Sequence, residues 1–231
     1  MHENLIRMKA VSLILKDLEQ QFVFVGGATV SLYATDPELA DEVRPTDDVD
    51  VIVELATYGG YADLDEKLRS LGFTNDVASG VICRYKIKGI VVDVMPTETN
   101  VMGFSNKWYP EGFQNAIDYN LEEGQVIKYF SLPYFFASKW EAYLGRGKGD
   151  YRTSKDFEDI IYVLENVDDF EKQMRAAPDN VLKYLKEEIS KVMFTDAFEE
   201  GIYAHLRGGY GGADATYIKM RLQDALGIME P

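Results

Sequence analysis

The chain has 231 residues, of which 46% are hydrophobic and 27% charged, as in an ordinary soluble protein of one large domain or a core with an appendage. No run approaches the ~18–20 apolar residues of a membrane span, and charges interrupt the apolar N-terminal stretch, unlike a secretory signal, so we expect a cytoplasmic protein. The formal charge of −15 repels nucleic acid at long range and argues against nonspecific DNA binding.

The first elements predict a strand that ends in two glycines. Apolar residues recur at helical spacing over residues 5–18, and the run Phe-Val-Phe-Val at 22–25 is typical of a short strand. Gly26-Gly27 follows, and then a helical stretch at 28–33. This junction would let the backbone approach a bound phosphate closely, although a tight turn without a ligand also explains two glycines.

The next strand, predicted over residues 46–53, carries two acids on one face. Side chains alternate along a strand, so Asp48 and Asp50 point the same way and the valines point the other way. Two neighbouring carboxylates repel each other unless a cation lies between them, which indicates a divalent metal. The alternative is that these acids only mark the solvated start of a strand.

Residues 62–71 predict a helix, and residues 81–87 and 90–95 predict a hairpin around the turn Lys88-Gly89. Asp93 lies inside the apolar second strand of that hairpin, where a carboxylate is costly unless it is paired or coordinated. Cys83 is interpreted as a small buried residue without chemistry.

The second half is predicted to be mainly helical. Residues 97–125 are interpreted as an irregular or partly helical connection, and residues 126–130 as a further strand. The predicted helices are 133–145, 156–164, 179–192, 194–206 and 215–226, and the glycine-rich residues 207–212 are interpreted as a flexible link.

Two charged residues of this half are candidates for the site. Lys139 falls on the apolar stripe of its helix, with Phe136, Trp140, Tyr143 and Leu144, so it either contacts phosphate or extends its ammonium into water. Asp156 lies at the start of the next helix with Asp159, where capping and solubility are the simpler explanation.

Taken together, these residues resemble a known signature. Gly26-Gly27, then Arg44-x-Thr46-x-Asp48-x-Asp50 before Val-Ile-Val, then Asp93, resembles the signature of polymerase-β-type nucleotidyltransferases. The Arg-x-Thr-x-Asp-x-Asp form, with Lys139 and Asp156 downstream, is more specifically similar to AbiEii/AbiGii-type toxin nucleotidyltransferases over about residues 22–164.

The resemblance implies a set of roles. Asp48, Asp50 and Asp93 would be the catalytic acids and the ligands of Mg²⁺, with two ions expected. The residues implied in nucleotide binding are Gly26, Gly27, Arg44, Thr46, Lys139 and Asp156.

We therefore expect an α/β (α+β) fold, with a small mixed sheet flanked by helices in residues 1–127 and a helical region in residues 128–231. The expected activity moves a nucleoside monophosphate from an NTP to a hydroxyl. As the resemblance implies, the acceptor would be a tRNA end or a protein, in a toxin with a possible antitoxin partner. The alternatives are a small-molecule acceptor such as a cationic aminoglycoside, which the negative charge favours, and a nucleotide-binding module without catalysis.

Overall fold

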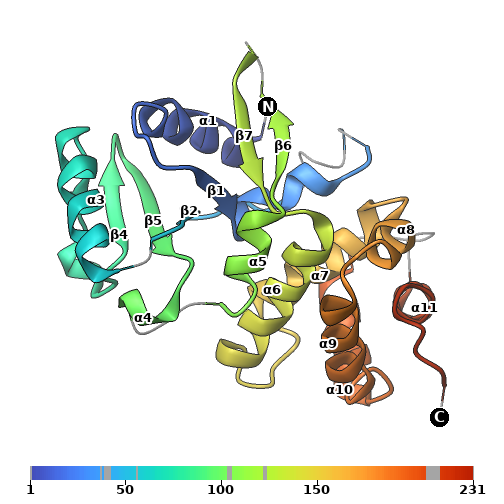
Figure 1. Ribbon diagram of the computed structural model, residues 1–231. Coiled ribbons are helices and arrows are strands. Elements are labelled where there is room, and N and C mark those ends of the chain that lie inside the picture. Colours follow the sequence, from blue (N-terminus) through green and yellow to red (C-terminus); the bar gives the residue numbers. More distant parts are fainter. Residues whose placement is uncertain are drawn as a thin grey trace. The chain divides into compact units, whose positions relative to one another are not determined.

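The computed structural model describes residues 2–36, 38, 43–55, 57–102, 106–121, 124–206 and 214–230. They form one mixed sheet and a set of helices, which confirms the expected α/β class (Figure 1). The chain divides into two compact units, residues 1–32 with 41–131 and residues 33–40 with 132–231. The domain limits 1–127 and 128–231 stay a prediction.

The sheet belongs to the first unit and has seven strands in the order β3-β4-β5-β2-β1-β7-β6. The central strand β2 runs antiparallel to β1 and parallel to β5, while β7 runs parallel to β1. The strands are β1 Phe22–Val25, β2 Asp48–Val53, β3 Thr74–Asn75, β4 Arg84–Ile87, β5 Ile90–Pro96, β6 Ile117–Asn120 and β7 Val126–Tyr129.

The burial of β2 shows why this strand lies at the centre. Val49, Val51 and Val53 are at most 1% exposed, whereas Asp48 and Asp50 are only partly buried. The apolar side chains thus anchor the strand in the core, and its first half presents acids on the other face, as the alternation predicted.

The first unit also contains helices. They are α1 Glu3–Leu15, the 3₁₀ helix η1 Gly27–Tyr33, α3 Tyr58–Ser70, the short 3₁₀ helix η2 Val77–Ser79, α4 Thr99–Met102 and α5 Tyr109–Gln114. Helix α3 lies beside β4 and β5 (Figure 1), where the hydroxyl of Tyr85 donates a hydrogen bond of 2.8 Å to Asp65. The stretch predicted as helical at 28–33 is the 3₁₀ helix η1.

The second unit is helical, as predicted. Its helices are α6 Leu132–Arg146, α7 Lys155–Asn166, α8 Phe170–Arg175, α9 Asp179–Ser190, α10 Asp196–His205 and α11 Ala215–Leu226. Rings of α6, α7, α10 and the α6–α7 connection form its core, among them Trp140, Tyr143, Tyr151, Phe157 and Phe198.

One residue of the stripe predicted on α6 does not face inward. Leu144 was predicted to face inward with Trp140, but it is 48% exposed. The glycine-rich residues 207–212 lie outside the described residues. Among the helices that the structure describes, none combines the length and the apolar character that crossing a membrane requires.

Candidate functional site

Three carboxylates meet where the first half of β2 lies beside the middle of β5. The parallel pairing of these strands places Asp50 directly opposite Asp93. Asp48, Asp50 and Asp93 each offer an oxygen, and the three oxygens lie within 4.8 Å of one another. Carboxylate oxygens are the ligands that Mg²⁺ and Ca²⁺ prefer, so this group has the donor chemistry for a hard divalent cation.

Gly26 lies against this carboxylate group. Its backbone has a φ of +73°, and a Cβ built on it would lie 2.0 Å from Oδ2 of Asp50. A side chain at this position would therefore displace the Asp50 carboxylate. The turn is closed by Thr29, whose hydroxyl donates a hydrogen bond of 2.9 Å to the Gly26 carbonyl. Gly27 begins η1, and its role in phosphate binding stays a prediction.

Arg84 joins two of the three carboxylates and is the functional candidate that the sequence reasoning missed. Its Nε and Nη2 donate hydrogen bonds of 2.8 and 2.7 Å to the two oxygens of Asp93. The same Nη2 donates a hydrogen bond of 2.7 Å to Oδ2 of Asp48. The hydrogen bonds to Asp93 raise the pKa of this guanidinium further above its already high value, so Arg84 is a permanent positive charge beside the acids.

The position of Arg84 can be found by counting along the hairpin. Pairing outward from the turn Lys88-Gly89 brings Ile87 opposite Ile90 and then Arg84 opposite Asp93. The same hairpin buries Cys83, which is 2% exposed and whose thiol pKa burial raises to about 12. Cys83 is therefore a buried, protonated thiol, which confirms its interpretation as a small buried residue.

Arg44 and Thr46 lie on the approach to β2. Thr46 is 6% exposed, its amide donates a hydrogen bond of 3.0 Å to Oδ1 of Asn4, and its hydroxyl donates one of 2.8 Å to the Asp48 carbonyl. The carbonyl of Arg44 accepts a hydrogen bond from the Asn4 amide group at 3.3 Å. These contacts fix the start of β2 and hence the position of Asp48. The roles of Arg44 and Thr46 in nucleotide binding stay predictions.

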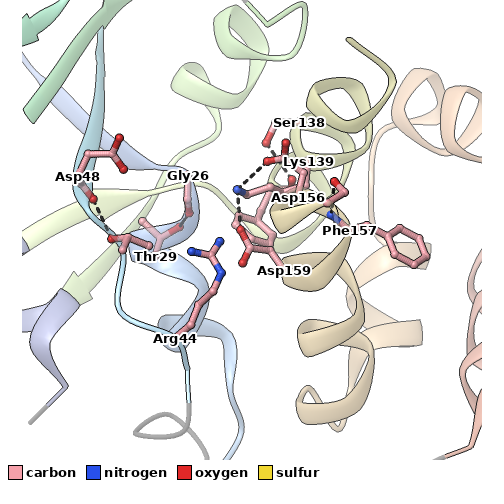
Figure 2. A network of polar contacts seen from close by, with 12 residues as sticks. Gly26, Thr29, Arg44, Asp48, Ser138, Lys139, Asp156, Phe157 and Asp159 are labelled. Atoms are coloured by element: carbon pink, nitrogen blue, oxygen red, sulfur yellow. Dashed lines mark hydrogen bonds and ion pairs between the residues drawn. The ribbon is translucent and has the colours of Figure 1, made fainter. Parts of the chain in front are cut away.

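Lys139 and Asp156 belong to the second unit, where they form a buried ionic group with Asp159 (Figure 2). The ammonium of Lys139 lies 3.1 Å from Oδ1 of Asp156 and 2.7 Å from Oδ2 of Asp159. All three side chains are at most 7% exposed. The alternative in which Lys139 extends its ammonium into water is therefore wrong, because this ammonium is buried between two carboxylates. The interpretation of the two acids as surface caps is also wrong, because they are buried and the Ser154 side chain caps α7.

Burial alone would oppose the ionisation of Asp156. Two hydrogen bonds from Arg146, at 2.7 and 2.8 Å, and the charge of Lys139 outweigh this effect and lower the Asp156 pKa. The contact of Lys139 and Asp156 with a nucleotide stays a prediction, and the structure shows both residues as members of a buried ionic group.

The chain was also compared with known proteins. No protein-family model matches it, and no curated protein matches it at a significant level. A solved structure that it resembles is the crystal structure of an antigenic nucleotidyltransferase-like protein from Paracoccidioides brasiliensis. The TM-score is 0.48 and the sequence identity 17%, and the similarity covers 88% of this chain and 94% of that chain.

Proposed function

We propose that the protein is a Mg²⁺-dependent nucleotidyltransferase, which moves a nucleoside monophosphate from an NTP to a hydroxyl and releases pyrophosphate. The observation that carries this proposal is the convergence of Asp48, Asp50 and Asp93 within 4.8 Å, beside a glycine that leaves no room for a side chain. Such a group fits a divalent cation because its donors are all carboxylate oxygens.

The chain's own residues would then have distinct tasks. Asp48, Asp50 and Asp93 hold the metal, which supplies positive charge to the triphosphate and to the attacking oxygen. Gly26 allows the backbone of the β1–η1 turn to approach Asp50 closely, so that an NTP phosphate can reach the same place. Lys139 and Asp156 are proposed to contact the nucleotide, and two ions are expected in the loaded enzyme.

For the acceptor, we propose a tRNA end or a protein hydroxyl, with a toxin role and an antitoxin partner, as the motif resemblance implies. The formal charge of −15 favours a second candidate, in which the acceptor is a small cationic molecule such as an aminoglycoside. A nucleotide-binding module without turnover is the third reading. The first two differ in which molecule carries the label after reaction, and the third would label no acceptor.

The test is incubation with labelled NTPs, Mg²⁺ and either a cell extract or a panel of aminoglycosides. We expect label on an acceptor with the wild type and none with Asp48→Asn plus Asp50→Asn. Asp118→Asn is the matched control, because this acid lies on β6 with 59% of its side chain exposed and pairs with Lys128. Transfer that persists in the double variant would contradict the proposal, and NTP binding without transfer would favour the module.

A further inference from the structure

Arg84 occupies the position between two proposed metal ligands. Its guanidinium reaches both oxygens of Asp93 and one oxygen of Asp48, in three contacts of 2.7–2.8 Å. Its side chain is 25% exposed, and that of Asp93 only 11%. A planar guanidinium fork matches a carboxylate in this bidentate geometry, which makes the Arg84–Asp93 contact specific.

A divalent cation and this guanidinium would compete for the same oxygens. An ion shared by the three carboxylates needs lone pairs of Asp48 and Asp93, and Arg84 already uses Oδ2 of Asp48 and both oxygens of Asp93. Two cations at one group of acids also repel each other, and partial burial weakens the screening of that repulsion by water and salt. A carboxylate oxygen has a second lone pair that a metal can use, so the repulsion between the two cations is what weakens the contacts of Arg84 when an ion binds.

We propose that Arg84 is a built-in competitor of the divalent metal: in the free protein it holds Asp48 and Asp93, and metal binding displaces it from Asp48. This inference rests on the proposed function, because it takes the three carboxylates as the metal site. Arg84 is then a positioning residue that offsets part of the negative charge of the acids before the metal arrives and sets how tightly the free protein binds the metal.

The direction of the effect separates this role from a simple scaffold role. If Arg84 only held the carboxylates in place, its removal would weaken metal binding. If it competes, its removal strengthens metal binding, because the acids keep their charge and lose their internal cation. The metal-free protein would at the same time become less stable, since three carboxylates would remain close together without a counter-charge.

The experiment measures Mn²⁺ binding to the free protein, without nucleotide, by electron paramagnetic resonance of unbound Mn²⁺. We expect Arg84→Gln to bind Mn²⁺ about tenfold or more tightly than the wild type, as the loss of one charge-assisted contact would give. Arg69→Gln is the matched control, because Arg69 pairs with Asp65 within α3 and should leave Mn²⁺ affinity unchanged. Asp48→Asn plus Asp50→Asn should abolish the binding.

A second variant guards against a folding defect in Arg84→Gln. Arg84→Lys keeps the positive charge but replaces the fork by one ammonium, which cannot make the same three contacts. It should bind Mn²⁺ more tightly than the wild type and less tightly than Arg84→Gln. Thermal unfolding supplies an independent readout: with EDTA the melting temperature of Arg84→Gln should fall, and Mn²⁺ should raise it by more than it raises that of the wild type.

The outcomes are distinguishable. Equal or weaker Mn²⁺ binding by both Arg84 variants, with wild-type binding that depends on Asp48 and Asp50, overturns the competition and leaves the metal site of the proposed function standing. Mn²⁺ binding that does not depend on Asp48 and Asp50 in any variant overturns both.

Discussion

Gly26 and Gly80 have almost the same φ angle in different surroundings. Their φ angles are +73° and +72°, but a Cβ on Gly26 would meet Asp50 at 2.0 Å whereas a Cβ on Gly80 would meet nothing within 4 Å. The two positions therefore separate the cost of a left-handed backbone from the cost of crowding the carboxylate.

We expect Gly80→Ala to lower the free energy of unfolding by about 1–2 kcal/mol, the cost of this backbone region for a residue with a Cβ. Gly26→Ala should carry the same cost and, in addition, displace Asp50, so that Mn²⁺ no longer raises the free energy of unfolding. Urea unfolding with and without Mn²⁺ measures both effects. Equal stability losses and equal Mn²⁺ effects in the two variants would show that the close approach has no consequence.

Asp156 gives a prediction about pH, because its pKa is lowered in the folded protein. Burial opposes this shift, and the hydrogen bonds from Arg146 and the charge of Lys139 outweigh it. A carboxyl with a lowered folded pKa stabilises the protein above its unfolded pKa of about 3.9, and this contribution is lost as the pH falls through the folded pKa.

We therefore expect Asp156→Asn to be less stable than the wild type at pH 7, and the difference to shrink as the pH falls below about 4. Urea unfolding of both proteins at several pH values between about 3 and 7 measures the difference in their free energies of unfolding. The effect of the other acids cancels in this difference, because both proteins contain them. A difference that stays constant, or that grows on acidification, would contradict the assignment of the lowered pKa to Asp156.

At the scale of elements, the β4–β5 hairpin sets the register that brings Arg84 to Asp93. Its turn has two residues with positive φ, Lys88 at +49° and Gly89 at +81°. Two-residue hairpin turns of this kind favour Asn-Gly, because asparagine tolerates the left-handed region better than lysine.

Lys88→Asn should accordingly raise the free energy of unfolding by about 0.5 kcal/mol without changing Mn²⁺ binding. Lys86→Asn is the matched control, because it makes the same substitution inside β4. It should lower the free energy of unfolding, since asparagine is a poor strand residue and the ion pair of Lys86 with Asp76 would be lost. Chemical denaturation of the two variants should move in opposite directions. A loss of stability in Lys88→Asn as large as in Lys86→Asn would refute this account of the turn.

The elements that the sequence predicted well have a clear pattern of apolar residues, either a short continuous run or a helical stripe. The core of β2 and the strand β1 are short runs of β-branched and aromatic residues, and the long helices of the second unit have a buried stripe. Strands β3 and β6 were missed because their residues are mostly exposed and polar, so they depend on pairing with β4 and β7 rather than on their own pattern.

The candidate site was predictable in part for a similar reason. Alternation along β2 placed Asp48 and Asp50 on one face, and an acid inside an apolar strand drew attention to Asp93. The partners of Lys139 were not predictable, because helical spacing shows that a residue lies on an apolar face but not which charges face it from the next helix. Arg84 was within reach, since its place opposite Asp93 follows from the hairpin turn alone.

At the scale of the whole molecule, the excess of acids governs the response to salt. Thirty-nine acidic and 24 basic side chains give a formal charge of −15, and the repulsion among these charges opposes the compact state. Salt screens this repulsion, and it also weakens exposed ion pairs such as Arg69–Asp65 and Lys183–Glu187. Each exposed pair contributes only about 0–1 kcal/mol, and the buried contacts of Lys139 are screened much less.

The stabilisation gained as salt screens the repulsion should therefore exceed the stabilisation lost as the surface ion pairs weaken. We expect the melting temperature at pH 7.5, with EDTA present, to rise as NaCl increases from about 10 to about 150 mM, over which the screening length falls from about 30 to about 8 Å. At pH 5, where carboxyl groups begin to take up protons, the same salt step should give a smaller rise, because the net charge is smaller. Differential scanning calorimetry at both pH values measures the two increments. A melting temperature that falls with salt at pH 7.5 would mean that favourable ion pairs, and not the excess of like charge, dominate the electrostatic free energy of this fold.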